Sequence, residues 1–403
     1  MSHGNESAVP EISLADPEVL RDPFAAHRRA REQAPLARLL APGFGSIWLV
    51  TRYQEARAAL GDERFALTAD SMMRAGIPED LLPYLVTMSH MPDPDHARLR
   101  RLVSSAFGSR RIAALRPWIE QIADELLDQL PDHAEEGSVD LLRHYAQPLP
   151  ITVVCELLGI PATDHQLWRD CTAALAAGPG PGAIDAIRTI VDSARSAIAL
   201  RRREPGDNLI SDLIRAQDED PARVSETEMV TLVWNLVIGG QENPANLIAN
   251  AVAALLTHPD QLALLRADPA LMPRAIQELM RWCGPGLQTI PRYATEDVEL
   301  DGQVVRKGEP IAVALASANR DERVFADPDR LDITRAPQSS GQLGFGHGRN
   351  YCLGRSLAET EVETALGRLL TRWPGLALAV APEELPRVPD PGAWRLAALP
   401  VTL

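Results

Sequence analysis

The feature that most constrains the fold is one long apolar segment between residues 225 and 256. It opens with Ser225-Glu226-Thr227-Glu228, and a serine followed three residues later by a glutamate is the capping box that starts many helices. Apolar residues lie on every side of the helix that follows, so we expect it to cross a hydrophobic core. With the other helical patterns of the chain, this segment predicts a mainly helical protein.

The same helix contains the unusual run Gly239-Gly240-Gln241-Glu242-Asn243-Pro244. Each glycine lowers helix stability, and Pro244 lacks the N–H that would bond to the Gly240 carbonyl. That carbonyl is then available to a water or a ligand, and the glycines let a flat cofactor or O₂ come close to the backbone. A simple structural kink is the alternative interpretation.

A single cysteine stands in the glycine-rich loop Phe345-Gly346-His347-Gly348-Arg349-Asn350-Tyr351-Cys352-Leu353-Gly354, just before a helical pattern from Ala358 to Leu370. The glycines let backbone N–H groups approach the sulfur, and the helix start adds the positive end of its dipole. Both effects favour the thiolate, which is a good axial ligand for haem iron. The alternative is a buried structural cysteine.

This order of residues resembles the cytochrome P450 family, most closely its soluble bacterial members, and the resemblance runs from about Asp16 to the C-terminus. It implies a P450-like fold, mainly α with a small β-rich region, and a haem between the long central helix and the cysteine loop. Cys352 would be the axial ligand, so it is the metal-binding residue, and Phe345 would pack beside the haem. Gly346 and Gly354 belong to the same cofactor loop.

Cations that neutralise the haem propionates are the next expectation. His96 and Arg100 are four residues apart on one predicted helix face, which taken alone is often merely a solvated basic face. The resemblance assigns both to the propionates, together with Arg292. Two residues before the cysteine the family usually has His or Arg, whereas this chain has Asn350, with Arg349 one place earlier. Whether Arg349 makes the propionate contact is left open.

The resemblance aligns the run in the long helix with the oxygen-activating segment of the family, a glycine followed by an acid and an alcohol. Gly240 and the acid Glu242 are present, but Asn243 stands where the alcohol is expected. A hydroxyl both donates and accepts through one atom, which an amide cannot do. We therefore hypothesise that an ordered water or a polar group of the substrate supplies the proton.

Glu278 and Arg281, three residues apart, attract each other on a helix face and taken alone form an ordinary pair. They also match the family's Glu-x-x-Arg, which implies a buried structural triad completed by a later arginine, either Arg323 or Arg330. We assign these residues a role in stability.

The substrate pocket is the least defined part of the prediction. Residues 61–92 look like a long loop, which the resemblance places over the substrate pocket, although the methionines of this loop are equally compatible with an ordinary core. The run from Gly178 to Gly182 forbids helix and is either a lid hinge or a plain flexible loop. The candidate lining residues are Met72, Met73, Met88, Val237, Leu287, Thr289, Ile290 and Trp394.

Composition excludes several classes of function. The formal net charge of −15 argues against nucleic-acid binding. The polar N-terminus and the lack of a long apolar span predict neither a signal peptide nor a membrane anchor. The four cysteines lack CxxC spacing, so three of them are expected in the core of a cytoplasmic protein. Without linker or charge block, residues 1–403 are expected to form one monomeric domain with a polar tail of about 1–15.

The β-rich region is expected from a strand at Ser46–Thr51, a hairpin at Val298–Val305 with an Asp-Gly turn, and a strand at Ile311–Ala316. We expect these strands to form one small sheet beside the helices.

The resemblance implies a haem-thiolate monooxygenase that uses haem b (iron protoporphyrin IX) and O₂ to hydroxylate a small organic molecule, in a tailoring step of secondary-metabolite biosynthesis. The chain has no flavin or iron–sulfur motif, so electrons from NAD(P)H would arrive through a ferredoxin and a ferredoxin reductase. Because the alcohol is missing, oxidative C–C or C–N coupling or ring formation through substrate radicals remains an alternative. A third is a non-catalytic relative that recruits other enzymes.

Overall fold

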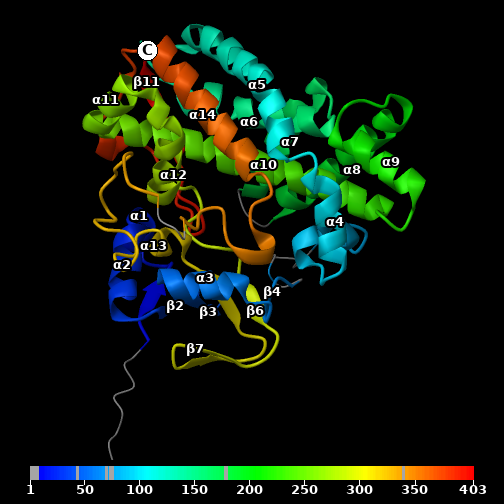
Figure 1. The fold of residues 1–403 in the computed structure, drawn as a ribbon, viewed down its shortest axis with the longest axis horizontal. Helices are drawn as coiled ribbons and strands as arrows, with labels where there is room; N and C mark the ends of the chain where they lie inside the picture. Colours follow the sequence, from blue (N-terminus) through cyan, green and yellow to red (C-terminus); the bar gives the residue numbers. More distant parts are fainter. Residues whose placement is uncertain (1–8, 42–44, 69–70, 72–76, 177–179, 338–340) are drawn as a thin grey trace, which may run out of the picture. The chain divides into compact units, whose positions relative to one another are not determined.

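The computed structural model describes residues 9–41, 45–68, 71, 77–176, 180–337 and 341–403. The chain divides into two compact units (Figure 1). Unit 1 comprises Met1–Ser71, Arg274–Cys352 and Arg387–Arg395, and unit 2 comprises Met72–Pro273, Leu353–Pro386 and Leu396–Leu403. Each unit is built from three separate stretches of chain, and the single domain expected from the sequence stays a prediction.

The long helix of unit 2 is α10, Glu226–Thr257, and it confirms the expectation from the apolar segment. Its capping box is formed, with the Glu228 N–H donating to Ser225 Oγ at 3.2 Å and the Ser225 N–H donating to the Glu228 carboxylate at 2.7 Å. The helix continues through Gly239, Gly240 and Pro244 without a break. Its side chains are buried on most sides because α6 (Pro148–Leu158), α8 (Pro181–Arg203) and α14 (Arg355–Arg372) pack against it.

The remaining long helices and the small sheet of unit 2 complete its architecture. They are the helices α4 (Asp95–Ser104), α5 (Ser109–Gln129), α7 (His165–Ala176), α9 (Leu209–Glu219) and α11 (Pro259–Ala267), and the antiparallel sheet of β10 (Ala377–Leu378), β11 (Pro400–Thr402) and β5 (Val139–Asp140). Short 3₁₀ turns at Leu82–Leu85 and Met88–His90 fit the predicted long loop. No helix in the described ranges is long and apolar enough to cross a membrane.

The run from Gly178 to Gly182 differs in part from its prediction. Pro181 and Gly182 form the first turn of α8, so they do not exclude helix. A proline at the first helical position loses nothing, because its N–H would have no partner inside the helix. Residues 177–179 lie outside the described residues.

Unit 1 is built on a six-stranded sheet in the order β1-β2-β3-β9-β6-β4. Strands β2 and β3 pair antiparallel, and β3 pairs parallel with β9. The strands are β1 (Glu11–Ser13), β2 (Leu36–Ala41), β3 (Gly45–Val50), β4 (Phe65–Ala66), β6 (Arg292–Ala294) and β9 (Pro310–Val313). The helices of this unit are α1 (Pro17–Arg21), α2 (Pro23–Gln33), α3 (Tyr53–Gly61), α12 (Met272–Cys283, most of it in this unit) and α13 (Leu315–Ala318).

The sheet differs from expectation at two places. The predicted hairpin forms as β7 (Val298–Leu300) and β8 (Gln303–Val305), but it is a separate two-stranded sheet that does not enlarge the main one. The predicted strand at residues 311–316 ends at Val313, and Leu315 already begins α13. Local strand propensity does not specify which strand an edge will pair with.

Both faces of the main sheet are buried. Along β3, Trp48 and Val50 belong to one hydrophobic cluster, while Ile47 and Leu49 belong to another. Alternate side chains of a strand point to opposite faces, so a strand of continuous apolar residues predicts burial on both sides.

A buried ion network holds α12 to the segment that follows α13. The Glu278 carboxylate accepts two hydrogen bonds of 2.7 Å from Arg281 and two of 3.1 Å from Arg335. Arg281 also donates to the carbonyls of Asn319 and Pro328 at 2.9 and 2.8 Å. Glu278 and Arg281 are each no more than 4% exposed, so this network supports the stability role that the sequence assigned them.

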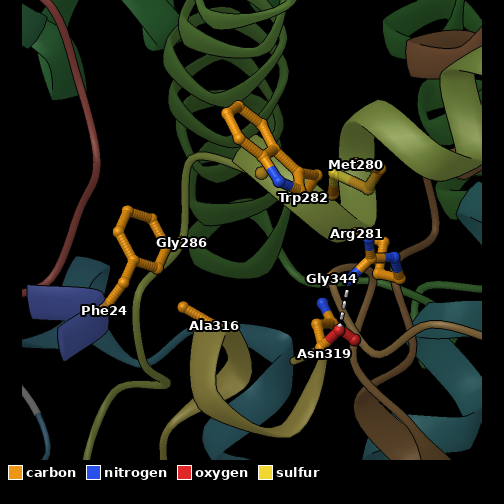
Figure 2. A pocket seen from close by; sticks show the side chains of 9 residues that line it. Phe24, Met280, Arg281, Trp282, Gly286, Ala316, Asn319 and Gly344 are labelled. Carbon is orange, nitrogen blue, oxygen red and sulfur yellow. Dashed lines mark hydrogen bonds between the residues drawn. The ribbon is translucent and has the colours of Figure 1, made fainter. Parts of the chain in front are cut away.

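The expected third member of this triad was wrong. Arg335 completes it, whereas Arg323 pairs with Asp321 and Arg330 contributes only its backbone carbonyl. Figure 2 shows the small cavity beside Arg281 and Asn319. Its volume of about 10 Å³ matches a single water, so this cavity cannot hold an organic substrate.

We expect Glu278→Gln to lower the free energy of unfolding by about 3–5 kcal/mol, because the two guanidinium groups lose their buried counter-charge. Urea denaturation measures the change. Glu18→Gln is the matched control, since Glu18 and Arg21 have the same spacing but lie at the surface, where a pair contributes little. Equal losses in the two variants would contradict a special role for the buried network.

Candidate functional site

Backbone hydrogen bonds close the cysteine loop in unit 1. The Cys352 N–H donates to the Phe345 carbonyl at 2.9 Å, and the Tyr351 N–H donates to the Gly348 carbonyl at 3.0 Å. Phe345 is buried and the Cys352 thiol is half-buried. Three residues after Cys352 the chain enters α14, whose N-cap is Gly354. The loop therefore presents a partly accessible sulfur just ahead of a helix start, as the sequence predicted.

Two glycines make this loop geometry feasible. Gly346 and Gly348 have φ values of +77° and +72°, in the left-handed region that favours glycine. A Cβ added at Gly348 would lie 3.0 Å from the backbone of Gly61 and from the Leu60 carbonyl oxygen. The loop thus packs directly on the end of α3, where only a residue without a side chain fits.

The other three cysteines behave as core thiols, which confirms their assignment. Cys155, Cys171 and Cys283 are buried, and burial raises the pKa of each thiol, that of Cys283 to about 12. They therefore stay protonated at neutral pH. Cys352 differs from them in being half-buried at the start of a helix.

Two of the predicted propionate partners lie together in unit 1. Arg292 donates to the Leu60 carbonyl at 3.0 Å, and burial together with the nearby charge of Arg349 lowers the pKa of Arg292. Among the described residues, no carboxylate forms an ion pair with Arg292. The side-chain oxygen of Asn350 is buried without a hydrogen bond from the described part of the chain. The two neighbouring guanidinium groups, and not Asn350, favour binding of an anionic group at this place.

The other two predicted partners lie in unit 2. His96 and Arg100 share one face of α4, where His96 is buried and Arg100 is half-buried. His96 Nδ1 lies 3.7 Å from an Asp93 carboxylate oxygen. The structure thus groups the four cations as two pairs, one in each unit.

A short open stripe interrupts the burial of α10. Gly239 and Asn243 are exposed, and Asn235 one turn earlier is half-buried, whereas the other residues from 234 to 244 are buried or half-buried. Positions four apart share a helix face, so these three form one stripe. A Cβ added at Gly239 would meet no atom within 4 Å. The stripe gives a flat group or a substrate direct access to the helix.

The two helix glycines have different roles. A Cβ added at Gly240 would lie 2.8 Å from the Val154 side chain, so Gly240 lets α6 pack closely against α10. Gly239 faces the open stripe. Close packing of α6 on α10 is therefore sufficient to explain a glycine at position 240, which the sequence analysis assigned to the catalytic segment.

The polar residues that follow these glycines differ in their hydrogen bonds and burial. Asn243 makes no hydrogen bond with any residue that the structure describes, and Glu242 is half-buried next to it. Gln241 is buried, with its side-chain oxygen 3.1 Å from the Thr172 hydroxyl on α7. This last contact could not be predicted from the sequence, because helical spacing does not reveal which helix lies opposite.

The candidate substrate residues are divided between the two units. Met72 and Met73 lie outside the described residues. Met88 is buried in a 3₁₀ turn, and Val237 is fully buried on the side of α10 opposite to Gly239, since two residues turn a helix by about 200°. Val237 therefore does not belong to the open stripe, and its assignment to the substrate pocket stays a prediction.

The remaining candidates belong to unit 1. Leu287 is buried, Ile290 is 54% exposed, and Thr289 pairs with the backbone of Val313. Trp394 packs edge-to-face on Phe24 and lies 3.7 Å below the Arg387 guanidinium, a packing arrangement that accounts for its position without a ligand. Their assignment to the substrate pocket stays a prediction.

We expect Gly348→Ala to destabilise the protein more than Gly302→Ala. Both glycines have positive φ, a conformation that costs an alanine roughly 1–2 kcal/mol, but only Gly348 also faces backbone atoms at 3.0 Å. Gly302, in the β7–β8 turn, faces open space. Thermal unfolding of the two variants measures the difference, and equal shifts would contradict the close packing of the loop on α3.

Comparison with known proteins agrees with this geometry. The model of the family described as Cytochrome P450 matches residues 182–375. The chain is 40% identical to Cytochrome P450 107B1 of Saccharopolyspora erythraea over 97% of this chain and 96% of that protein. It is 38% identical to the 6-deoxyerythronolide B hydroxylase of the same organism over 90% and 92% of the two chains. The structure of the tirandamycin C-bound P450 monooxygenase TamI matches with a TM-score of 0.88 and 37% identity, covering 98% of this chain and 100% of that one.

A closed glycine loop with a half-buried thiol, a long buried helix with an open stripe, and full-length likeness to these enzymes lead to one conclusion. This chain belongs to the cytochrome P450 family and is a P450 monooxygenase.

Proposed function

We propose that this monooxygenase uses Cys352 as the thiolate ligand of haem b and hydroxylates a small secondary metabolite in a tailoring step. The observation that carries the proposal is the closed loop, which presents a half-buried sulfur immediately before α14. The helix dipole and nearby backbone N–H groups favour the thiolate at such a position. The hydroxylase of 6-deoxyerythronolide B, similar over most of its length, supports the choice of reaction and substrate class.

The residues of the chain fit a haem. A thiolate from Cys352 would hold the iron, and the cations Arg292 and Arg349 would bind a propionate, which relieves their mutual repulsion. His96 and Arg100 are the second pair of partners for a propionate. Arg349 is the better candidate than Asn350 for the contact near the cysteine, because the buried oxygen of Asn350 would repel a carboxylate. When bound, the haem supplies an iron centre at which O₂ is reduced and substrate C–H bonds are attacked.

Residues of the open stripe of α10 would take part in the reaction with O₂. Asn243 is exposed on this stripe, where its amide can donate one hydrogen bond to a water or to the substrate. Glu242, beside it, would position that water. We propose that the proton passes through the water, since neither the amide nitrogen nor the amide oxygen can relay it through a single atom.

The electrons would come from NAD(P)H through a ferredoxin and a ferredoxin reductase. The sequence carries no flavin or iron–sulfur motif that would replace such partners. Exposed arginines such as Arg101 and Arg110 are suited to attract an acidic ferredoxin. We propose that the enzyme works as a monomer in the cytoplasm.

Oxidative coupling of substrate radicals is the second candidate function. The exposed Asn243 favours it, because a coupling reaction needs no proton relay through an alcohol at this position. Product analysis with purified redox partners separates the two functions. An oxygen atom from O₂ in the product supports hydroxylation, and a new C–C or C–N bond without that atom supports coupling.

We expect Cys352→Ser to abolish the reduced-CO spectrum that is typical of a thiolate ligand, because a serine hydroxyl is not a comparable donor to iron. Cys171→Ser is the control, since that thiol is a buried core residue. Absorption spectroscopy of the two reconstituted variants measures the result. A normal thiolate spectrum in Cys352→Ser would overturn the proposed function.

We expect Asn243→Thr to lower the fraction of NAD(P)H that ends in product by several-fold, because a hydroxyl at this position would compete with the specialised water or substrate group for the proton. The ratio of product formed to cofactor consumed is the measurement. An unchanged or improved ratio would show that Asn243 is not part of a specialised proton route.

A further inference from the structure

A cleft in unit 2 has no role in the site described above. It lies where α4 and α9 pack against each other (Figure 1), and its volume is about 550 Å³. Sites for small organic ligands have volumes of roughly 300–1,000 Å³, so the cleft is large enough for one. Four arginines and two acids are among its lining residues, although the whole chain has a formal net charge of −15.

One of the four arginines, Arg98, is already neutralised. Its guanidinium donates to the carboxylates of Glu228 and Asp95 at 2.6 and 3.0 Å, and to the Arg223 carbonyl at 2.6 Å. Glu228 is also the residue that completes the capping box of α10. Arg98 therefore joins α4 to the start of α10, and we assign it no ligand.

The other three arginines are available to a ligand. Arg101 on α4 is exposed, and within the described ranges it forms no ion pair and donates only to a backbone carbonyl of its own helix, at 3.2 Å. Arg215 pairs with Asp212, three residues before it, and Arg223 pairs with Glu219, four residues before it. The side chains of Arg215 and Arg223 are 60% and 42% exposed. Such exposed pairs contribute little to stability, so an incoming anion can replace either acid at small cost.

The cleft is separate from the predicted propionate partners on the same helix. The residues of α4 and its C-cap that line the cleft are spaced i, i+3, i+4 and i+7, which places them on one helix face: they are Arg98, Arg101, Leu102 and Ser105. His96 and Arg100 lie on another face, since Arg100 is two residues from Arg98 and two residues turn a helix by about 200°. An anion in the cleft therefore does not take the place of a propionate.

The cleft also has an apolar part. Leu102 on α4 is half-buried and Ala216 on α9 is buried, and both line the cleft. A guanidinium group binds a carboxylate or a phosphate through two parallel hydrogen bonds. The lining therefore suits a ligand that has acidic groups attached to a compact carbon skeleton, more than it suits an inorganic ion.

We propose that this cleft binds a small organic dianion, which carries either two carboxylates or one phosphate ester. Arg101 binds its charge from α4, Arg215 and Arg223 bind it from the opposite wall, and its carbon skeleton lies on Leu102 and Ala216. The acidic remainder of the chain repels such a ligand, so the dianion is concentrated at this cationic cleft. The inference does not depend on the proposed function, because no residue of the cysteine loop or of the open stripe takes part.

The test is isothermal titration calorimetry of the full-length, haem-loaded protein with two probes, phthalate for the dicarboxylates and phenyl phosphate for the phosphate esters. At least one probe should bind with a dissociation constant below about 1 mM at low salt. Its affinity should fall as NaCl is added, because salt screens the charges. Phthalamide, which is uncharged, should not bind. The haem absorption spectrum should stay unchanged on binding, which separates the cleft from a site next to the iron.

Four variants locate the binding. Arg101→Gln should weaken the affinity by at least about tenfold, and Arg203→Gln is the matched control, since Arg203 is exposed at the end of α8 outside the cleft. Ser105→Asp should abolish binding, because it adds a negative charge to the lining. Ser104→Asp is its control, since the neighbouring Ser104 is exposed and does not line the cleft.

The inference is overturned if neither dianion binds, or if Arg101→Gln and Ser105→Asp bind the probe as tightly as their controls do. Ferredoxin affinity that falls in Arg101→Gln while neither dianion binds to the wild type would also overturn it, and would assign the cleft to the redox partner. These outcomes are distinct from failure of the proposed function, which the reduced-CO spectrum reports whether or not the cleft is occupied.

Discussion

The site depends first on one backbone hydrogen bond, from the Cys352 N–H to the Phe345 carbonyl at 2.9 Å. This bond closes the loop that carries the sulfur, and the left-handed glycines supply the turns that closure needs. The position of the thiol is therefore fixed by main-chain geometry, and α14 begins three residues later. The chemistry attributed to Cys352 follows from that placement, because the three buried cysteines have the same side chain and remain ordinary thiols.

The second constraint is that α10 is buried on most sides and yet opens on one stripe. Its two glycines have different roles in this. Gly240 makes room for the Val154 side chain of α6, and Gly239 leaves the open face of the helix clear. The same face carries Asn243 and then the buried amides of Asn246 and Asn250. One side of this helix therefore runs from the open stripe to buried amides.

Two buried carboxyl groups of this chain, those of Glu278 and Glu361, have different surroundings. Glu278 is surrounded by two guanidinium groups and joins α12 to a distant loop. Neither carboxyl oxygen of Glu361 has a hydrogen-bond partner in the described part of the chain, and burial raises the pKa of this carboxyl well above its usual value. The first arrangement joins two segments of the chain, whereas burial disfavours the charged form of Glu361.

The sequence by itself determined the elements whose signals are local. The capping box at Ser225, the Asp-Gly turn of the hairpin and the glycine pattern around Cys352 each depend on residues only a few positions apart, and each formed as predicted. Tertiary structure decided which distant groups meet: Arg335 as the partner of Glu278, the hairpin as a separate sheet, and the burial of Glu361. The reason is physical, because a local signal fixes backbone geometry within one turn, whereas the partner of a side chain depends on how helices and strands far apart in the chain pack together.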